Sequence, residues 1–215
     1  MAAMVGAAPD FLVDGPDDGP VIVLAHGAGA AMDSPFMAAF AAGHGHAGLR
    51  CVRFEFPFMA ARRTTGKRPG PDRAPVLIET WHRVVGALGP PGRLVIGGKS
   101  LGGRMASLVA DELGVAGLVC LGYPFHPVAK PERTRTEHLA GIQTPTLIVQ
   151  GERDALGARA EVGGYRLAPA IRLHWLADGD HGFKPRKRSG FSEAGNWADG
   201  IAEVADFVTA LIKWT

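Results

Sequence analysis

One serine in the sequence is set between glycines in a way that suits nucleophilic chemistry. Positions 98–102 read Gly-Lys-Ser-Leu-Gly, a G-x-S-x-G pattern centred on Ser100. An apolar run ends at Gly97 and an amphipathic stretch begins at Leu101, so the pattern predicts a tight turn from a strand into a helix. The flanking glycines let such a helix pack close to its strand. The backbone N–H of Leu101 would then lie at the helix N-terminus, where it can stabilise an oxyanion.

The same residues could be compared with a phosphate-binding loop, which also ends in Gly-Lys-Ser. That motif requires a glycine at position 93, where the sequence has Arg93. Its glycine loop also follows a strand, whereas positions 93–97 are themselves predicted to be strand. The phosphate loop is therefore rejected, and the remaining alternative is a glycine-rich turn in which Ser100 merely caps the helix.

A nucleophilic serine needs a base and an orienting acid, and the chain has candidates for both after later strands. The apolar run 146–150 is followed by Asp154, and the run 171–176 is followed by His181. The carboxyl ends of parallel strands meet at one edge of a sheet, where ligands bind in open α/β sheets. We therefore expect Ser100, Asp154 and His181 to meet there, in the chain order Ser, Asp, His.

Other carboxylates near these positions are alternatives for the acid. Glu152 lies closer to the end of its strand than Asp154 and is expected to face away. Asp180 adjoins His181, and adjacent side chains rarely point at each other, while Asp178 is typical of a turn. Asp154 is therefore the predicted acid, with Glu152 as the alternative.

The small-residue loop 26–30, His-Gly-Ala-Gly-Ala, follows the first strongly apolar strand. A second oxyanion donor is expected in such a loop, and we assign it to the Ala28 backbone N–H, with Gly29 as the alternative. His26 is expected to hold the loop in place by hydrogen bonds, and His126, after another strand, could line the pocket. No histidine or carboxylate pattern indicates a metal site, and no cofactor is expected.

These groups must be positioned by elements that alternate between strands and helices. Short apolar runs predict strands at 21–25, 51–56, 93–97, 118–121, 146–150 and 171–176. Amphipathic segments between them predict helices, the last beginning near Asn196 as its N-cap, and residues 58–73 are predicted to form a long polar loop. Short apolar strands between amphipathic helices predict a three-layer α/β/α sandwich with a mostly parallel, twisted sheet.

Composition limits the function classes that the chain can belong to. Its 215 residues, 47% hydrophobic and 20% charged, predict one globular domain spanning residues 1–215 rather than a disordered chain. A formal net charge of +2 is too small to indicate nucleic-acid binding. No apolar run approaches about 18 residues and no secretion signal precedes the first strand, so we expect a cytoplasmic protein without membrane contact.

Five segments together resemble a known family. They are His-Gly-Ala-Gly-Ala, Phe-Pro-Phe-Met, Arg-Ala-Pro-Val-Leu, Gly-Gly-Lys-Ser-Leu-Gly-Gly-Arg and Gly-Asp-His-Gly-Phe. From about residue 20 to its end the chain resembles the α/β-hydrolases, and within them a compact dienelactone-hydrolase-like subgroup related to testis-expressed hydrolase-like and NSL-complex subunit proteins. It differs from true dienelactone hydrolases in having Ser100 where they have a cysteine nucleophile.

The resemblance implies an eight-stranded, mostly parallel sheet and a Ser/Asp/His triad. Its strand order would place Cys51 and Cys120 about three strand spacings apart, roughly 14 Å, which is too far for a disulfide. Only positions 123–145 separate two predicted strands where larger hydrolases insert a lid. The resemblance therefore implies a site without a lid domain, open to solvent.

Residues after the strands suggest how a substrate would be held. Aromatic and apolar side chains at Phe58, Met59, Tyr123 and Phe125 predict an acyl or alcohol pocket, with ordinary loop packing as the alternative. Basic residues follow two strands, and we hypothesise that they form a positive rim favouring anionic substrates, with a solvated surface as the alternative. They are Arg62, Arg63, Lys67, Arg68 and the run 184–188.

The sequence thus predicts a hydrolase that cleaves small-molecule esters or thioesters through an acyl-enzyme. A peptidase or an acyltransferase would use the same residues, and a non-catalytic interaction module could use the same fold. The sequence leaves the oligomeric state open.

Overall fold

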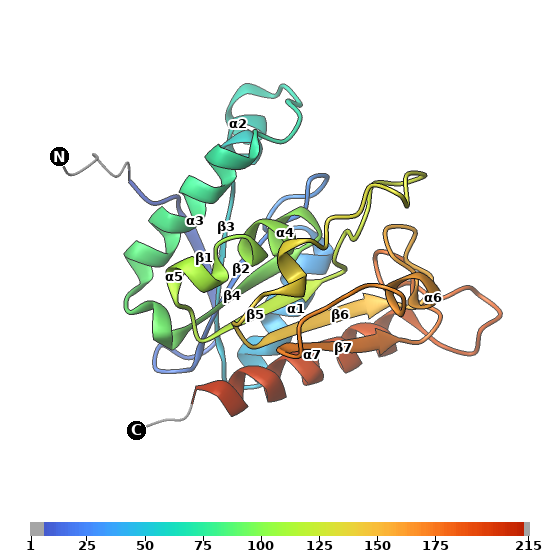
Figure 1. Cartoon of the computed structure of the whole chain (residues 1–215). Helices are drawn as coiled ribbons and strands as arrows, with labels where there is room; N and C mark the ends of the chain where they lie inside the picture. Colours follow the sequence, from blue (N-terminus) through green and yellow to red (C-terminus); the bar gives the residue numbers. More distant parts are fainter. Residues whose placement is uncertain (1–6, 213–215) are drawn as a thin grey trace.

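A seven-stranded sheet forms the centre of the computed structural model, which describes residues 7–212 (Figure 1). The strand order is β1-β3-β2-β4-β5-β6-β7, and only β1 runs antiparallel to its neighbour. The strands are β1 (Phe11–Asp14), β2 (Val21–Ala25), β3 (Arg50–Phe54), β4 (Leu94–Lys99), β5 (Gly117–Leu121), β6 (Thr146–Gly151) and β7 (Ile171–Leu176). The predicted, mostly parallel sheet is confirmed, although the described residues form seven strands and not the eight implied by the family resemblance.

Helices cover both faces of this sheet and make the two outer layers of the sandwich (Figure 1). They are α1 (Pro35–His46), α2 (Pro57–Thr65), α3 (Ala74–Leu88), α4 (Leu101–Ser107), α5 (Ala110–Leu113), α6 (Arg159–Val162) and α7 (Glu193–Leu211). Helices α1 and α7 pack on one face, and α3 and α4 pack on the other. Between residues 7 and 212, no helix is both long and apolar enough to cross a membrane.

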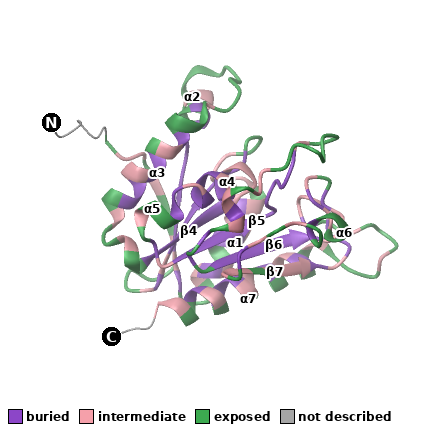
Figure 2. Ribbon diagram, in the orientation of Figure 1, coloured by how far each residue is buried: buried purple, intermediate pink, exposed green. Residues whose placement is uncertain are grey.

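Strand β2 shows why the central strands are apolar along their whole length. Ile22 and Leu24 pack toward α1 and α7, whereas Val23 and Ala25 pack toward α3 and α4, and all four are fully buried. A strand covered on both faces has no solvent side on which to place polar residues. Figure 2 shows the same burial along β4, β5 and β6.

Helix α2 corrects the prediction that residues 58–73 form only a polar loop. Pro57 stands in the first turn, and Gly66 ends the helix in the left-handed conformation at φ 66°. The Asp72 carboxylate accepts the Phe58 N–H at 2.9 Å and so satisfies one free donor of the first turn. The many Arg and Thr residues suggested a loop, but the proline and glycine mark the ends of a short exposed helix.

Helix α7 begins earlier than predicted, because its N-cap is Ser192 and not Asn196. The Ser192 Oγ accepts the N–H of Gly195 at 3.0 Å. Asn196 lies inside the helix, buried, and its amide donates to the carbonyls of Ala177 and Phe183 at 3.0 and 2.8 Å. Asn196 therefore anchors a loop from within the helix.

Two smaller differences from the predicted elements concern short segments. Strand β1 has four residues at the sheet edge, and its apolar run of Phe11, Leu12 and Val13 is shorter than the runs of the central strands and was not predicted as a strand. The helix predicted after Ser100 is divided into α4 and α5. The implied separation of the cysteines agrees with the structure, since Cys51 and Cys120 are free and buried on β3 and β5.

Candidate active site

Ser100 occupies a strained turn between β4 and α4. Its backbone has φ 51° and ψ −110°, a conformation that costs a non-glycine residue about 1–3 kcal/mol. The turn is held at both ends, because the Ser100 N–H donates to the Leu121 carbonyl and its own carbonyl accepts the Arg104 N–H, each at 3.0 Å. The predicted strand-to-helix turn is confirmed, and these two hydrogen bonds hold the serine in its strained conformation.

The glycine at position 102 allows helix α4 to approach β2. A Cβ at this position would overlap the carbonyl oxygen of Ala25 and lie 2.8 Å from that of His26. Both atoms belong to backbone at the end of a central strand and cannot move aside without disturbing the sheet. Glycine is therefore required here by the close packing of α4 on β2.

We expect Gly102→Ala to lower the free energy of unfolding by about 1–3 kcal/mol or more, because the added methyl meets rigid backbone. Gly86 is a matched control: it lies in α3, is exposed, and has open space where a Cβ would stand. Gly86→Ala should leave stability unchanged or raise it by up to about 1 kcal/mol. Urea unfolding followed by circular dichroism measures both, and equal stabilities would contradict the close-packing account.

His181 and Asp154 form a hydrogen-bonded pair. The His181 Nδ1 lies 2.7 Å from the Asp154 Oδ2, and the Asp154 side chain is fully buried. The other carboxylate oxygen, Oδ1, accepts the Leu156 N–H at 2.8 Å. A buried carboxylate held in this way keeps a proton on Nδ1 and leaves Nε2 free to accept one.

Gln150 is a site residue that sequence reasoning missed. It is fully buried at the end of β6, and its Nε2 donates to Asp154 Oδ2 at 2.9 Å. Its Oε1 accepts the Tyr123 N–H at 2.7 Å, which fixes the direction of the amide. Gln150 thus orients Asp154. In the sequence, the signal that could have identified Gln150 is a polar residue at the end of an otherwise apolar strand.

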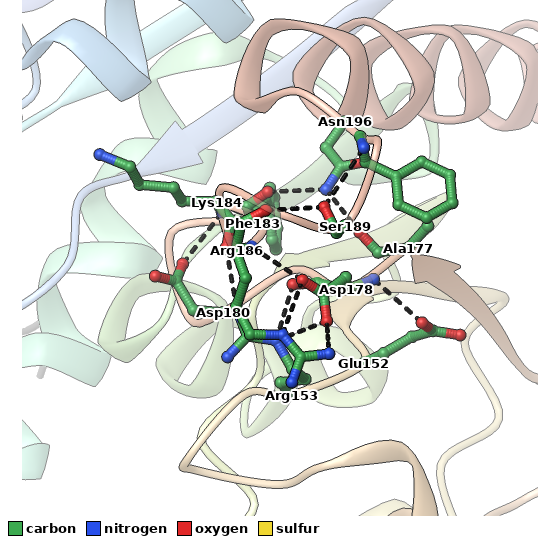
Figure 3. Close-up of polar contacts among 11 residues, drawn as sticks. Glu152, Arg153, Ala177, Asp178, Asp180, Phe183, Lys184, Arg186, Ser189 and Asn196 are labelled. Atoms are coloured by element: carbon green, nitrogen blue, oxygen red, sulfur yellow. Dashed lines mark hydrogen bonds and ion pairs between the residues drawn. The ribbon is translucent and has the colours of Figure 1, made fainter.

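Glu152, the alternative acid, and Asp178 are both engaged elsewhere (Figure 3). Glu152 accepts the Asp178 N–H at 3.0 Å and pairs with Arg159 at 2.6 Å, and these contacts lower the pKa of its carboxyl. Asp178 pairs with Arg186 and Arg153, and the Arg186 guanidinium lowers the pKa of that carboxyl. Both carboxylates brace the turn that precedes His181 rather than contact its ring.

The loop that carries His181 is also tied to helix α7 and to itself. Figure 3 shows the Asn196 amide reaching the carbonyls of Ala177 and Phe183. The Trp197 Nε1 donates to the Gly182 carbonyl at 3.1 Å, and the Asp180 carboxylate accepts the Gly182 N–H at 2.8 Å. These bonds hold the histidine loop without using the ring nitrogens of His181.

Ser100 and His181 open onto the same cleft, which has a volume of about 370 Å³. No direct hydrogen bond joins the two side chains among the described residues, and such contacts are often long without substrate. The lining includes the loop 27–30 after β2, with both Ala28 and Gly29, and the first residues of α1. The structure therefore brings the predicted nucleophile, base and oxyanion loop to one hollow, with the acid buried behind His181.

The four apolar residues predicted to form the pocket lie in the core instead. Phe58, Met59, Tyr123 and Phe125 are between 0% and 4% exposed and none of them lines this cleft. Their side chains pack beneath the strand ends on the α3 and α4 face of the sheet. The sequence alone could not distinguish this burial from an orientation toward the cleft. The apolar wall of the cleft comes from α1 instead, through Phe36 and Met37.

Lys99, immediately before the serine, is a second residue that sequence reasoning missed. It lines the cleft, and its Nζ donates to the His181 carbonyl at 2.5 Å. The ammonium lies over the rings of Phe36 and Phe183, 5.3 and 5.4 Å from their centroids. Burial lowers the pKa of Lys99 to about 8, against the opposing attraction of Asp154 and Asp180. The second residue of the G-x-S-x-G segment thus places a titratable charge beside the nucleophile.

Part of the predicted positive rim is occupied in internal contacts. Arg62 donates to the carbonyls of Pro69 and Ala28, and so steadies the loop of the cleft. Arg63 pairs with Glu55 and Asp33 at 2.7 Å. Lys67, Arg68, Lys187 and Arg188 are exposed.

The other histidines singled out from the sequence are placed away from Ser100. His26 accepts the Phe56 N–H on Nε2 at 3.1 Å and donates from Nδ1 to the Gly27 carbonyl at 2.6 Å, and burial lowers its pKa. It holds the loop as expected. His126 is buried against Glu161 and does not line the cleft. Within residues 7–212, no group of three His, Cys, Asp or Glu side chains is arranged to hold a metal ion.

Comparisons with known proteins agree with this architecture. The family model described as the alpha/beta hydrolase domain matches residues 18–209. Among solved structures, XC6422 from Xanthomonas campestris, described as an a/b serine hydrolase without lid, is 18% identical, with 94% of this chain and 87% of that chain covered and a TM-score of 0.62.

Two further solved structures carry descriptions of enzymes. Est1E from Butyrivibrio proteoclasticus, solved with ferulic acid bound, is 15% identical, with coverage of 94% and 95% and a TM-score of 0.66. A thioesterase domain from the curacin biosynthetic pathway is 14% identical, with coverage of 92% and 93% and a TM-score of 0.61. At these identities the likeness establishes the shared fold.

Proposed function

The chain belongs to the alpha/beta hydrolase family, and from its site we propose that it is a serine hydrolase that cleaves small carboxylic esters or thioesters. The observation that carries the proposal is the His181–Asp154 hydrogen bond of 2.7 Å on the wall of the cleft into which the strained Ser100 opens. Esterases and a thioesterase among the structurally similar proteins support the same reaction class. The particular substrates of those proteins are not assigned to this chain.

In the proposed reaction, His181 Nε2 removes the proton from Ser100 Oγ as that oxygen attacks the carbonyl carbon of the substrate. The resulting tetrahedral intermediate collapses when His181 gives the proton to the leaving alcohol or thiol. A water molecule then attacks the acyl-enzyme, again with His181 as the base, and the bond from the acyl carbon to Ser100 Oγ breaks as His181 returns the proton to that oxygen and the carboxylic acid is released. Asp154 holds the Nδ1–H tautomer and stabilises the imidazolium throughout.

The oxyanion would be held by two backbone N–H groups, from Leu101 and from the loop after β2. Leu101 is the first residue of α4, so its N–H has no acceptor within the helix. Ala28 and Gly29 both line the cleft, and we assign the second donor to Ala28, with Gly29 as the alternative. Removal of one such donor typically costs about 3 kcal/mol of transition-state stabilisation.

The size and lining of the cleft favour a small substrate. A volume of about 370 Å³ lies at the lower end of ligand pockets, and the apolar wall of Phe36 and Met37 suits a short acyl or aryl group. Residues 122–145 between β5 and β6 include no helix longer than the short turn at His138–Ala140, so no lid domain covers the site from there. Such an open, shallow site fits small esters better than long-chain lipids.

The decisive test is labelling with a fluorophosphonate probe, followed by assay with an acyl-chain series of esters and matched thioesters. We expect stoichiometric labelling, mass-spectrometric localisation to Ser100, and the highest kcat/KM for short acyl groups. Ser34 is the other hydroxyl that lines the cleft, so a label on Ser34 would contradict the assignment. A folded protein inert to the probe and to the whole series would favour the non-catalytic interaction module. Anilide substrates and added alcohol acceptors separate a peptidase or an acyltransferase from an esterase.

Lys99 leads to a prediction about pH. With a pKa of about 8, its ammonium carries a positive charge below that pH and loses it above. The ratio of kcat/KM for an ester with an anionic acyl group to that for its neutral isostere should therefore fall, by about tenfold, as the pH rises through 8. Taking the ratio at each pH cancels any pH dependence that the two substrates share.

Lys99→Met tests the same prediction by removing the charge. The variant should show a low ratio that does not change with pH, even if both substrates react more slowly because the His181 loop is less firmly held. Lys187→Met, which removes an exposed lysine that does not line this cleft, should keep the wild-type profile. A wild-type ratio that stays constant from about pH 6 to 10 would show that Lys99 does not recognise charge.

A further inference from the structure

A second cavity, with a volume of about 520 Å³, lies beside helix α4 and shares no lining residue with the Ser100 cleft. It is lined by Arg104, Leu108, Thr134, Arg135, Glu137 and His138. Arg104 and Leu108 come from α4 and the residue after it, and the other four come from the connection between β5 and β6 (Figure 1). The hydrogen bond of 2.8 Å between Ser107 Oγ and His138 Nε2 joins these two segments.

The cavity is unusual because its two guanidinium groups have no anionic partner. Between residues 7 and 212, neither the Arg104 nor the Arg135 side chain donates a hydrogen bond or forms an ion pair, and the Arg104 Nε is buried with no acceptor. Glu137 is the one carboxylate on the wall among the described residues, and it pairs with neither arginine. Both arginines are half-buried, and the buried Arg104 Nε has lost its contact with water without gaining an acceptor, which costs free energy.

The charges around this cavity also repel one another. Burial lowers the pKa of Arg135, and the nearby positive charges of Arg104 and Arg133 lower it further. Burial and then Arg104 lower the pKa of His138, against the weaker attraction of Glu137 and Asp111. Arg104, Arg135 and Arg133 outnumber the one carboxylate on the wall, Glu137, so the hollow has a positive potential.

We infer that this cavity binds the oxyanion group, phosphate or carboxylate, of a small molecule. A planar guanidinium presents paired N–H donors that match the oxygens of either group, and two such forks on opposite segments can hold one oxyanion between them. The Thr134 hydroxyl stands on the same wall and can add a donor, and Leu108 supplies an apolar surface for the rest of the ligand. The cavity is larger than a bare ion needs, so a small organic phosphate or polycarboxylate fits its volume.

This site does not depend on the proposed hydrolysis, because none of its residues belongs to the Ser100 cleft. Binding is therefore measured directly, by isothermal titration calorimetry with inorganic phosphate and, in a second arm, with citrate, both at constant ionic strength. We expect saturable binding of one anion per chain. Tighter binding of phosphate identifies a phosphate-bearing ligand, and tighter binding of citrate identifies a carboxylate.

Substitutions locate the site. Arg104→Gln and Arg135→Gln should each weaken binding by at least about tenfold, and Arg104→Lys, which keeps the charge but loses the fork, should weaken it less. Arg166 is a matched control, since it is exposed and does not line the cavity, and Arg166→Gln should bind as the wild type does. Without ligand, the two glutamine variants should melt no lower than the wild type, because each removes one of two repelling charges.

A nuclear magnetic resonance titration of His138 provides a readout that a purely structural role would not affect. Bound anion should raise the pKa of His138, because a negative charge then faces its ring and offsets Arg104. The inference is overturned if neither anion binds saturably, if both glutamine variants keep wild-type affinity, or if Arg166→Gln loses as much affinity as they do. An unchanged His138 pKa on saturation would place the anion elsewhere.

Discussion

Ser100→Ala should abolish the hydrolysis that we propose, lowering kcat by about 10⁶-fold toward the small residual rate that the rest of the site supports. The Oγ is the atom that attacks the carbonyl, and alanine leaves nothing in its place. The variant should also lose fluorophosphonate labelling. Its circular dichroism spectrum and unfolding midpoint should match the wild type, because the backbone of the turn is held by the bonds from Leu121 and Arg104 and not by the side chain.

Two companion variants make this result interpretable. Ser189→Ala removes a hydroxyl from the histidine loop, where it donates to the Arg186 carbonyl, and should retain activity within about twofold. Ser100→Gly should be as inactive as Ser100→Ala yet more stable by about 1–2 kcal/mol, since glycine adopts φ 51° without strain. Full activity in Ser100→Ala would disprove the assignment of the nucleophile.

Asp154→Asn should lower kcat by about 10⁴-fold while the protein stays folded. The Leu156 N–H requires an oxygen at one end of the side chain, so the new amide nitrogen would stand at the other end, facing His181 Nδ1 and the Gln150 amide. His181 would then accept on Nδ1 and carry its proton on Nε2. In that tautomer it cannot take the proton from Ser100, whichever substrate is bound.

Glu152→Gln is the matched control, because this carboxylate is two residues away on the same segment. It braces the turn through Arg159 and the Asp178 N–H, so its loss should reduce activity by no more than about tenfold, through a less firmly held loop. A larger loss of kcat in Glu152→Gln than in Asp154→Asn would make Glu152 the functional acid. Steady-state kinetics on one short-chain ester decide between the two.

Much of the fold could be predicted from the sequence because its signals are local. A strand covered on both faces must be apolar throughout, as β2 is, so each central strand was visible as a short run between turn residues. The order of Ser100, Asp154 and His181 after successive strands followed from the rule that parallel strands present their carboxyl ends at one edge. Two short elements were missed, because the apolar run of β1 has only three residues and α2 is mostly polar after Met59.

Side-chain direction was the part that local patterns could not reveal. Phe58 and Tyr123 follow strands just as the proposed catalytic residues do. Their side chains are nevertheless buried, because they pack in the apolar core on the α3 and α4 face of the sheet. Gln150 and Lys99 look unremarkable in the chain and acquire roles only through contacts with residues distant in sequence. The loop around His181 likewise depends on an asparagine within α7.

The sequence by itself therefore determined the six parallel strands and the main helices between them, their order along the chain, and which candidate nucleophile, base and acid could meet at the strand ends. These follow from burial and backbone geometry, which operate over a few consecutive residues. Only the tertiary structure decided which side chains face the cleft, that Gln150 orients Asp154, and that Arg104 and Arg135 line one cavity without pairing with a carboxylate of the described residues. Such arrangements depend on how separate segments pack against each other. The pattern of apolar residues within a single segment does not predict that packing.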